Sequence, residues 1–313
     1  MSASWLGGAA TRHVELNRRL SKCKTLQDLQ HVLDSADGSL SLVNMVTALH
    51  RLAKVASGEK RGQGSRLSQQ LQKKLSQAMV LEQSREQVSI RTWSNTAWAM
   101  AKLQLQDVKI FELAEKTLAS KLDEVRPQEL ANILWSLGAT SLGNNLDLKR
   151  YVVHLLHHER EFEAQHLSNI AWSLAKMSSE PVLLQKVAFV AFGRLPEFTS
   201  QHLANMAWAC AKLGAVDVCW SSLARASLAR SFKPQEACNL LWAFATATVN
   251  VRDDTMSKVV AFLSTTLHSQ LPRCNPQDHA NFLWSMVALT AAERGISSAI
   301  AQAASEKLPE FSV

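Results

Sequence analysis

One short pattern, Asn-x-x-Trp, occurs six times in the 313 residues and constrains the fold more than any other feature of the sequence. The copies begin at Asn95, Asn132, Asn169, Asn205, Asn239 and Asn281. Successive asparagines are 37, 37, 36, 34 and 42 residues apart. A period of this size is typical of solenoids, in which each repeat is one supersecondary unit stacked on its neighbours. A degenerate copy begins at Asn44, with Thr47 in the place of the tryptophan.

Each repeat is predicted to form two helices. The first opens at Gln or Pro-Gln, as at Pro127-Gln128, because proline is tolerated in the first helical turn, and it runs through the tryptophan. The second helix carries apolar residues at the 3.6-residue period. No stretch alternates with period two over a useful length, so the expected fold is all-α. We predict an α-solenoid of about seven helix-pair repeats with a period of ~37 residues, wound into a right-handed superhelix.

The sequence suggests three parts. Residues 1–24 are a basic segment with some character of a targeting sequence. Residues 25–81 form a degenerate repeat with helices at 25–35, 44–55 and 66–81 and a basic loop at 57–65, and residues 82–313 form the six-repeat array. The last residues, 308–313, repeat the phrase that precedes a first helix at 195–200. We therefore expect the array to stop at the start of another repeat, with further chain or a protein partner covering that end.

Composition and charge narrow the class of protein. The chain is 47% hydrophobic, which is ample for a packed core, and no apolar run reaches the ~18 residues of a membrane helix. Five scattered cysteines without CxxC favour a reducing compartment over a disulfide framework. The net charge of +7 suggests an acidic partner such as RNA, but most of it lies in residues 51–74, which weakens the inference because a basic chain need not have a basic binding face. The bases of this basic segment are Arg51, Lys54, Lys60, Arg61, Arg66, Lys73 and Lys74.

A helical wheel predicts a polar face on each first helix. With the asparagine as position 0, positions −2, +1, +5 and +8 form an apolar stripe, and positions −4, 0, +3, +4 and +7 lie opposite it. Position +4 is always Ala or Ser, which we expect to leave space for a planar group. Three repeats have lysine at +7: Lys102, Lys176 and Lys212. Position −3 is polar and variable, with no evident structural role: Thr92, Glu129, His166, His202, Glu236 and Asp278.

Stacking would place these positions side by side, as in a surface that reads a polymer one unit per repeat. The same pattern also has a purely structural interpretation. Each asparagine could hydrogen-bond the adjacent repeat, each tryptophan could wedge two repeats together, and the lysines could be ordinary solvated charges.

We find no catalytic or metal-binding constellation. His154, His157 and His158 share one helical face, but no cysteine or carboxylate completes a metal site. A phosphate-binding glycine loop and a nucleophile–base set are both missing from the sequence. Cys210 and Cys238 lie in apolar helices, as inert core thiols do. We therefore expect no enzymatic activity, no cofactor and no metal.

Three segments resemble the octotricopeptide repeat, a family of organellar RNA-binding proteins. They are Pro127-Gln-Glu-Leu-Ala-Asn-Ile-Leu-Trp-Ser-Leu-Gly, Gln201-His-Leu-Ala-Asn-Met-Ala-Trp-Ala-Cys-Ala-Lys-Leu-Gly and Pro234-Gln-Glu-Ala-Cys-Asn-Leu-Leu-Trp-Ala-Phe-Ala. The resemblance covers about 90–313 and, more loosely, 39–81. It implies an α-solenoid that binds single-stranded RNA in mitochondria or plastids and acts in transcript stability, processing, splicing, translation or ribosome assembly. Many relatives carry a C-terminal RAP domain; we recognise none here and expect no RNA cleavage.

Two functions remain open from the sequence. In the first, single-stranded RNA or rRNA lies on the polar face, its phosphates near the +7 lysines and the basic segment and its bases near positions −3 and +4. In the second, the chain is a protein-binding scaffold, with the asparagines holding an extended peptide. A subunit of an organellar ribosome or other ribonucleoprotein would combine the two. A membrane partner is not expected.

Overall fold

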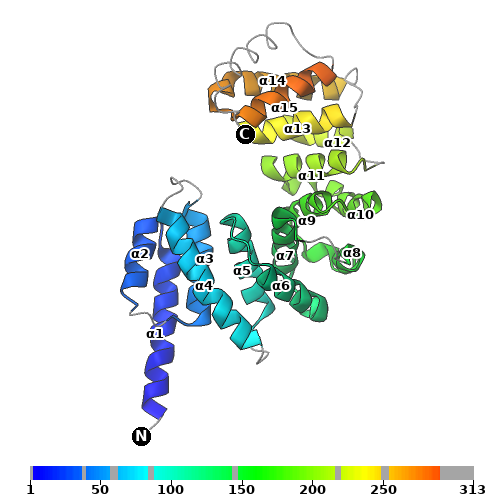
Figure 1. Cartoon of the computed structure of the whole chain (residues 1–313). Coiled ribbons are helices and arrows are strands. Elements are labelled where there is room, and N and C mark those ends of the chain that lie inside the picture. The colour runs from blue at the N-terminus through cyan, green and yellow to red at the C-terminus, as the bar shows by residue number, and fades with distance from the viewer. Residues whose placement is uncertain are drawn as a thin grey trace. The chain divides into compact units, whose positions relative to one another are not determined.

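The computed structural model describes residues 3–36, 40–56, 63–83, 88–142, 147–215, 220–247 and 254–289, and every regular element in these ranges is a helix (Figure 1). The first helices of the repeats are α1 (Ala3–Lys22), α3 (Leu42–Val55), α5 (Ile90–Lys102), α7 (Pro127–Thr140), α9 (Ala164–Lys176), α11 (Ser200–Lys212), α13 (Pro234–Thr246) and α15 (Pro276–Ala288). The second helices are α2 (Leu26–Asp34), α4 (Gln63–Gln83), α6 (Val108–Ser120), α8 (Leu148–His157), α10 (Pro181–Phe192), α12 (Trp220–Leu228) and α14 (Asp254–Gln270).

The chain divides into two compact units, residues 1–144 and residues 145–313. In the first unit, the first helices pack in series: α1 on α3, α3 on α5 and α5 on α7. In the second unit, the series runs from α9 through α11 and α13 to α15. Second helices pack against these rows, as α10 does on α9 and α14 on α13. This serial packing confirms the predicted all-α solenoid, and the handedness of its superhelix stays a prediction.

The N-terminal segment is helical where the sequence suggested only a basic extension. Residues 3–22 form α1, which buries Leu16 and Leu20 and packs on α3. A role of residues 1–24 in targeting remains untested. Of the expected basic loop at 57–65, residues 57–62 lie outside the described ranges, and the last three residues already belong to α4. The C-terminal phrase at 308–313 also lies outside them.

A recurrent junction connects each second helix to the next first helix. Short 3₁₀ turns at Leu122–Glu124, Glu159–Glu161, Leu195–Glu197 and Leu271–Arg273 follow α6, α8, α10 and α14. Position −7, which directly follows the turn in these four cases, is buried in all six Asn-x-x-Trp repeats: Val88, Val125, Phe162, Phe198, Phe232 and Cys274. These side chains belong to the apolar core.

In the second unit, long side chains at or just after the end of a second helix donate hydrogen bonds to the backbone of the preceding junction. Arg194 donates to the carbonyl of Phe162, and Arg230 Nε donates to that of Phe198 at 2.7 Å. Gln270 makes the corresponding bond to the carbonyl of Phe232. Repeats are therefore joined by polar contacts as well as by apolar packing. In the described ranges, no helix is both long enough and apolar enough to span a bilayer.

Candidate nucleic-acid interface

Four positions of each first helix remain accessible after stacking. In the six Asn-x-x-Trp repeats, position −4 is exposed and the asparagine at 0 is half-buried. The tryptophan at +3 is half-buried in five repeats and exposed at Trp284, and +7 is exposed except for the half-buried Thr246. In α9 these residues are Gln165, Asn169, Trp172 and Lys176. We call positions −4, 0, +3 and +7 of the first helices the Asn/Trp row; its accessibility agrees with the wheel.

The asparagines of the row make no side-chain hydrogen bond to any described residue. This holds for Asn95, Asn132, Asn169, Asn205, Asn239 and Asn281, each half-buried. The structural interpretation, in which each amide clamps the adjacent repeat, is therefore not supported within the described ranges. An amide carries two donors and one acceptor oxygen, so each repeat presents an unsatisfied hydrogen-bonding group at its accessible surface.

The tryptophans of the second unit form a continuous ladder. Ring centroids lie 6.4 Å apart between Trp172 and Trp208, 6.3 Å between Trp208 and Trp242, and 6.3 Å between Trp242 and Trp284. The interplanar angles are 32–34°. Aromatic pairs prefer centroid separations of about 4.5–7 Å, so neighbouring rings contact one another and help to join the repeats. The wedge interpretation therefore holds for this ladder, while the accessible edges remain available to a ligand.

Two of the three lysines at position +7, Lys102 and Lys176, lie close to a tryptophan. In the first unit, Lys102 Nζ of α5 is 5.5 Å from the ring centroid of Trp135 on α7. In the second unit, Lys176 Nζ is also 5.5 Å from the ring of Trp172, one turn earlier on the same helix. Both distances are within the ~6 Å of a cation–π contact. A positive charge and an aromatic surface therefore lie together, as in grooves that bind single-stranded nucleic acid.

The degenerate copy has a different register from the one that the sequence suggested. Asn44 is fully buried; its Oδ1 accepts from the Ser41 backbone N–H at 3.3 Å, and its Nδ2 donates to the carbonyl of His13 at 2.9 Å. It therefore occupies position −3, the capping position, and not position 0. Thr47 is consequently at 0 and His50 at +3. The alignment of Thr47 with the tryptophan was wrong because Asn44 mimics the row asparagine in sequence only.

Position −3 has a structural role that the sequence analysis did not assign to it. It is the third residue of each first helix, and in five of the six repeats its side chain accepts the backbone N–H of the residue before the helix. The distances range from 3.0 Å for Glu236 and Asp278 to 3.3 Å for His202. Thr92 instead contacts the hydroxyl of Ser89 at 3.0 Å. These contacts satisfy donors that the helix leaves unpaired.

Capping limits what position −3 can offer to a ligand. Glu129 and Asp278 are 4% and 7% exposed, while the other four are half-buried. The pKa of His166 and that of His202 are lowered, mainly because burial disfavours the charged ring. A neutral ring with an unprotonated Nδ1 is the form that can accept the capping bond. The N-cap pattern Thr199-x-x-His202 or Asn275-x-x-Asp278 was the sequence signal of this role.

The small residues at position +4 leave no open space. Ala99, Ser136, Ser173, Ala209, Ala243 and Ser285 are all fully buried. Within each unit, neighbouring first helices pack on one another, as α11 does on both α9 and α13, so the helix surface is covered over more of its circumference than a single apolar stripe predicts. The serine hydroxyls bond within the helix, as Ser173 does to the Asn169 carbonyl at 2.6 Å. The expected site for a planar group at +4 is therefore wrong.

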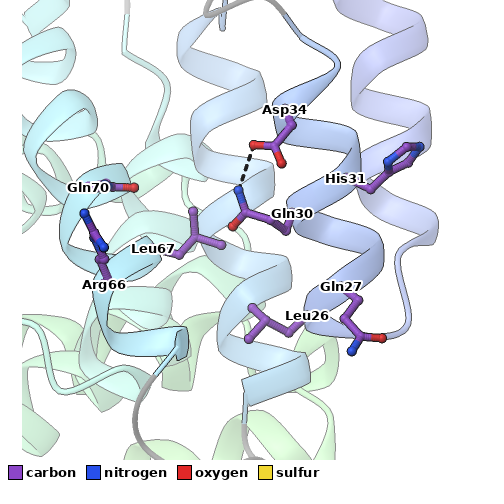
Figure 2. A pocket seen from close by; sticks show the side chains of 8 residues that line it. All are labelled: Leu26, Gln27, Gln30, His31, Asp34, Arg66, Leu67 and Gln70. Carbon is purple, nitrogen blue, oxygen red and sulfur yellow. Dashed lines mark hydrogen bonds between the residues drawn. The ribbon is translucent and has the colours of Figure 1, made fainter.

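The described residues of the basic segment lie on two helices, α3 and α4. Arg51 Nε donates to the carbonyl of Cys23, whereas Lys54 is exposed at the end of α3. Lys73 and Lys74 are exposed on α4, and Lys60 and Arg61 lie outside the described ranges. Arg66 lines a pocket formed by residues of α2 and α4 (Figure 2). The other lining residues are Leu26, Gln27, Gln30, His31, Asp34, Leu67 and Gln70 (Figure 2).

The other residues that the sequence analysis considered for chemistry are histidines with local contacts and cysteines buried in the core. His158 Nδ1 lies 3.2 Å from Glu161, and its ring is 4.7 Å from that of His154. No group of three metal-ligating side chains is found among the described residues. Burial raises the pKa of Cys210 to about 12 and also raises that of Cys238, which keeps both thiols protonated and unreactive.

A comparison with known protein families gives a match over most of the chain. Residues 64–291 match the family described as Tbc2 translation factor, N-terminal domain. The matched range begins in α4 and includes all six Asn-x-x-Trp repeats, while α3 lies outside it. A search of curated proteins found no match. Because the match covers most of the chain, the protein belongs to the family of the Tbc2 translation factor N-terminal domain, a family of helical, translation-related proteins.

Proposed function

We propose that the protein binds single-stranded RNA along the Asn/Trp row, as a non-catalytic factor in organellar RNA metabolism, most directly in translation. One observation carries the proposal: six row asparagines present amides that have no partner in the part of the chain that the structure describes, beside a row of aromatic rings. The match to a translation factor domain supports an RNA-related role. The resemblance to the octotricopeptide repeat supports the same substrate.

Each element of the row has a role in this proposal. The amides donate to and accept from base edges, and the exposed parts of the tryptophan rings supply surface on which bases stack. The ladder rings already contact one another, so bases lie over their exposed edges and do not insert between them. The +7 lysines neutralise nearby phosphates. Position −3 mainly stabilises the helices.

The two units contribute charge unequally. Residues 1–144 contain 19 Lys and Arg against 13 Asp and Glu, whereas residues 145–313 contain 15 against 14. The row lysines do not follow this difference, since Lys102 lies in the first unit and Lys176 and Lys212 lie in the second. We therefore expect the net charge of the first unit to attract the RNA over a longer range, while row lysines of both units contact phosphates directly.

The near-neutral second unit also favours an alternative, a scaffold that binds an extended peptide. A row of amides can bond a peptide backbone as readily as base edges. Such a scaffold within an organellar ribosome or other ribonucleoprotein would contact protein and rRNA together.

Binding to a random single-stranded RNA pool over a salt series distinguishes these functions. For single strands the logarithm of the affinity falls with a slope of about −0.7 per phosphate contact, so about five contacts predict a ~100-fold loss between 50 and 200 mM salt. Sequencing of the retained RNA should reveal an enriched motif. No retention at 50 mM salt would overturn the proposal, and salt-insensitive binding of an uncharged peptide library would favour the scaffold.

The compartment is also a proposal. The resemblance favours mitochondria or plastids, and residues 1–24 contain five bases and one acid, a composition that suits import. A fluorescent fusion to the C-terminus should accumulate in one of these organelles. Uniform cytosolic fluorescence would contradict this assignment.

A further inference from the structure

We propose that α3 is a ligand-binding helix of the Asn/Trp row, in which Thr47, His50 and Lys54 contact the same single-stranded RNA as the later repeats. This inference rests on the proposed function and extends it to a helix that lies outside the matched family range. The proposed interface then includes seven first helices, one more than the six that carry an Asn-x-x-Trp copy.

The helix cap fixes the register of α3. Ser41 Oγ accepts the backbone N–H of Asn44 at 3.2 Å, and Asn44 Oδ1 accepts that of Ser41 at 3.3 Å. The same reciprocal arrangement joins Asn275 and Asp278 in α15. Because Asp278 is three residues before the row asparagine, Asn44 places Thr47 at position 0, His50 at +3 and Lys54 at +7.

The burial pattern of α3 agrees with this register. Met45, Ala48 and Leu52, at positions −2, +1 and +5, are buried as in the other repeats. Thr47 and His50 are half-buried, like the asparagines and most of the tryptophans of the row. Lys54 is exposed, as are Lys102, Lys176 and Lys212. Three accessible positions therefore fall on the same helix face as in a complete repeat.

His50 takes the place of a tryptophan in contact with the next repeat. Its ring centroid lies 4.8 Å from that of Trp98, the +3 residue of α5, and α3 packs directly on α5. Burial, together with the charges of Lys54 and Arg51, lowers the pKa of His50 to about 4. The ring is therefore neutral at pH 7. A neutral, flat, half-exposed imidazole offers the stacking surface that an indole offers elsewhere in the row.

The two neighbouring row residues are available to a ligand. The hydroxyl of Thr47 makes no hydrogen bond within the described ranges, so it offers a donor and an acceptor where other repeats offer an amide. Lys54 takes part in no salt bridge among the described residues, and its position is that of Lys102 in the next first helix.

The experiment compares variants of the full chain on an RNA selected by the wild-type protein. His50→Ala and Lys54→Gln should each weaken binding about 5-fold or more, because they remove a stacking surface and a phosphate contact. Lys54→Gln should also reduce the salt slope by about 0.7. His50→Phe keeps a flat ring and should bind nearly as well as the wild type, even if His50→Ala is poorly folded. His31→Ala and Lys116→Gln, at exposed positions off the row, are the matched controls.

The outcomes separate this inference from the proposed function. If Asn95→Ala weakens binding while Lys54→Gln and a folded His50→Ala bind like the wild type, α3 lies outside the interface and the inference is wrong. If the wild-type protein retains no RNA, the proposed function fails and the inference fails with it. The wild-type protein should protect a stretch of the RNA from nuclease. If the His50→Ala variant protects a shorter stretch that has lost nucleotides at one end only, and the other variants do not, α3 is confirmed as a terminal contact.

Discussion

The indole rings of Trp208 and Trp242, which belong to successive repeats, lie with their centroids 6.3 Å apart and their planes tilted by 33°. Each is half-buried, so one side of the ring joins two first helices while another side meets solvent. The residue that marks the repeat in the sequence thus has a structural and a surface role together. The asparagine three residues earlier differs, because its amide makes no internal bond among the described residues.

Replacing a tryptophan inside the ladder should lower the free energy of unfolding more than replacing the last tryptophan, Trp284. Truncation of a buried Trp costs about 3–5 kcal/mol, and half-burial places Trp208→Ala near ~2–3 kcal/mol. Trp284 has one neighbour in the ladder and is 48% exposed, so Trp284→Ala should cost about 1 kcal/mol or less. Urea unfolding followed by circular dichroism measures both. Equal losses would show that the rings do not act as a ladder.

The capping contacts predict a loss of stability without loss of RNA specificity. Thr199 Oγ1 accepts the backbone N–H of His202 at 3.3 Å, and loss of such a cap costs about 1 kcal/mol. Thr199→Ala should therefore lower the free energy of unfolding by about that amount, whereas Thr199→Ser should not. The RNA motif selected by both variants should match that of the wild type. A shifted motif would mean that this helix end reads bases.

Stability should decline on acidification because three histidines are held neutral. The pKa values of His50, His166 and His202 are below the ordinary value of 6.5, so the unfolded chain binds more protons than the folded one. Their contribution is complete above pH ~6.5 and is lost as the pH falls toward the folded values, about 4 for His50. Thermal melts from pH 7.5 to 5 measure this decline.

The double variant His166→Asn, His202→Asn is the control for the pH effect. Asn44 shows that an amide can accept the same capping bond, and an amide does not titrate. The double variant should fold and lose less stability than the wild type between pH 7 and 5. An identical decline would assign the effect to other groups.

The row lysines should determine the salt dependence of RNA binding. Replacing Lys102, Lys176 and Lys212 together by Gln removes three candidate phosphate contacts, so the slope of log affinity against log salt should become shallower by about 2. Lys186→Gln, at an exposed position on α10, is the control and should leave the slope unchanged. If the triple variant keeps the wild-type slope, the phosphates lie elsewhere, and the exposed lysines of α4 become the next candidates.

Much of this architecture could be predicted from periodicity, because each Asn-x-x-Trp copy repeats the local packing of the others. The starts of α7, α13 and α15 at Pro127, Pro234 and Pro276 follow directly from proline's fit to the first helical turn. The register of α3 could not be read in this way, because Asn44 imitates the motif while its amide caps the helix.

Other features depend on neighbours that a single helical wheel does not include. Ser173 and Ala209 at position +4 lie opposite the apolar stripe, yet both are buried, because α9 packs on α11 and α11 packs on α13 as well. Arg230 reaches the carbonyls of Phe198 and Leu195 in the preceding repeat, a contact that depends on how the repeats stack. The capping role of position −3 could be predicted from the N-cap pattern, as Thr199 and His202 show.

The most direct test of the central claim is the affinity of the Asn205→Ala, Asn239→Ala double variant for a selected single-stranded RNA. Because neither amide has a partner among the described residues, the free energy of unfolding should change by less than about 0.5 kcal/mol for each substitution. Asn44→Ala, in contrast, should lose stability because its amide is buried and bonded. We predict that the double variant binds the RNA about 10-fold or more weakly at an unchanged thermal midpoint. Wild-type affinity in a folded double variant would contradict the assignment of the Asn/Trp row as the RNA interface.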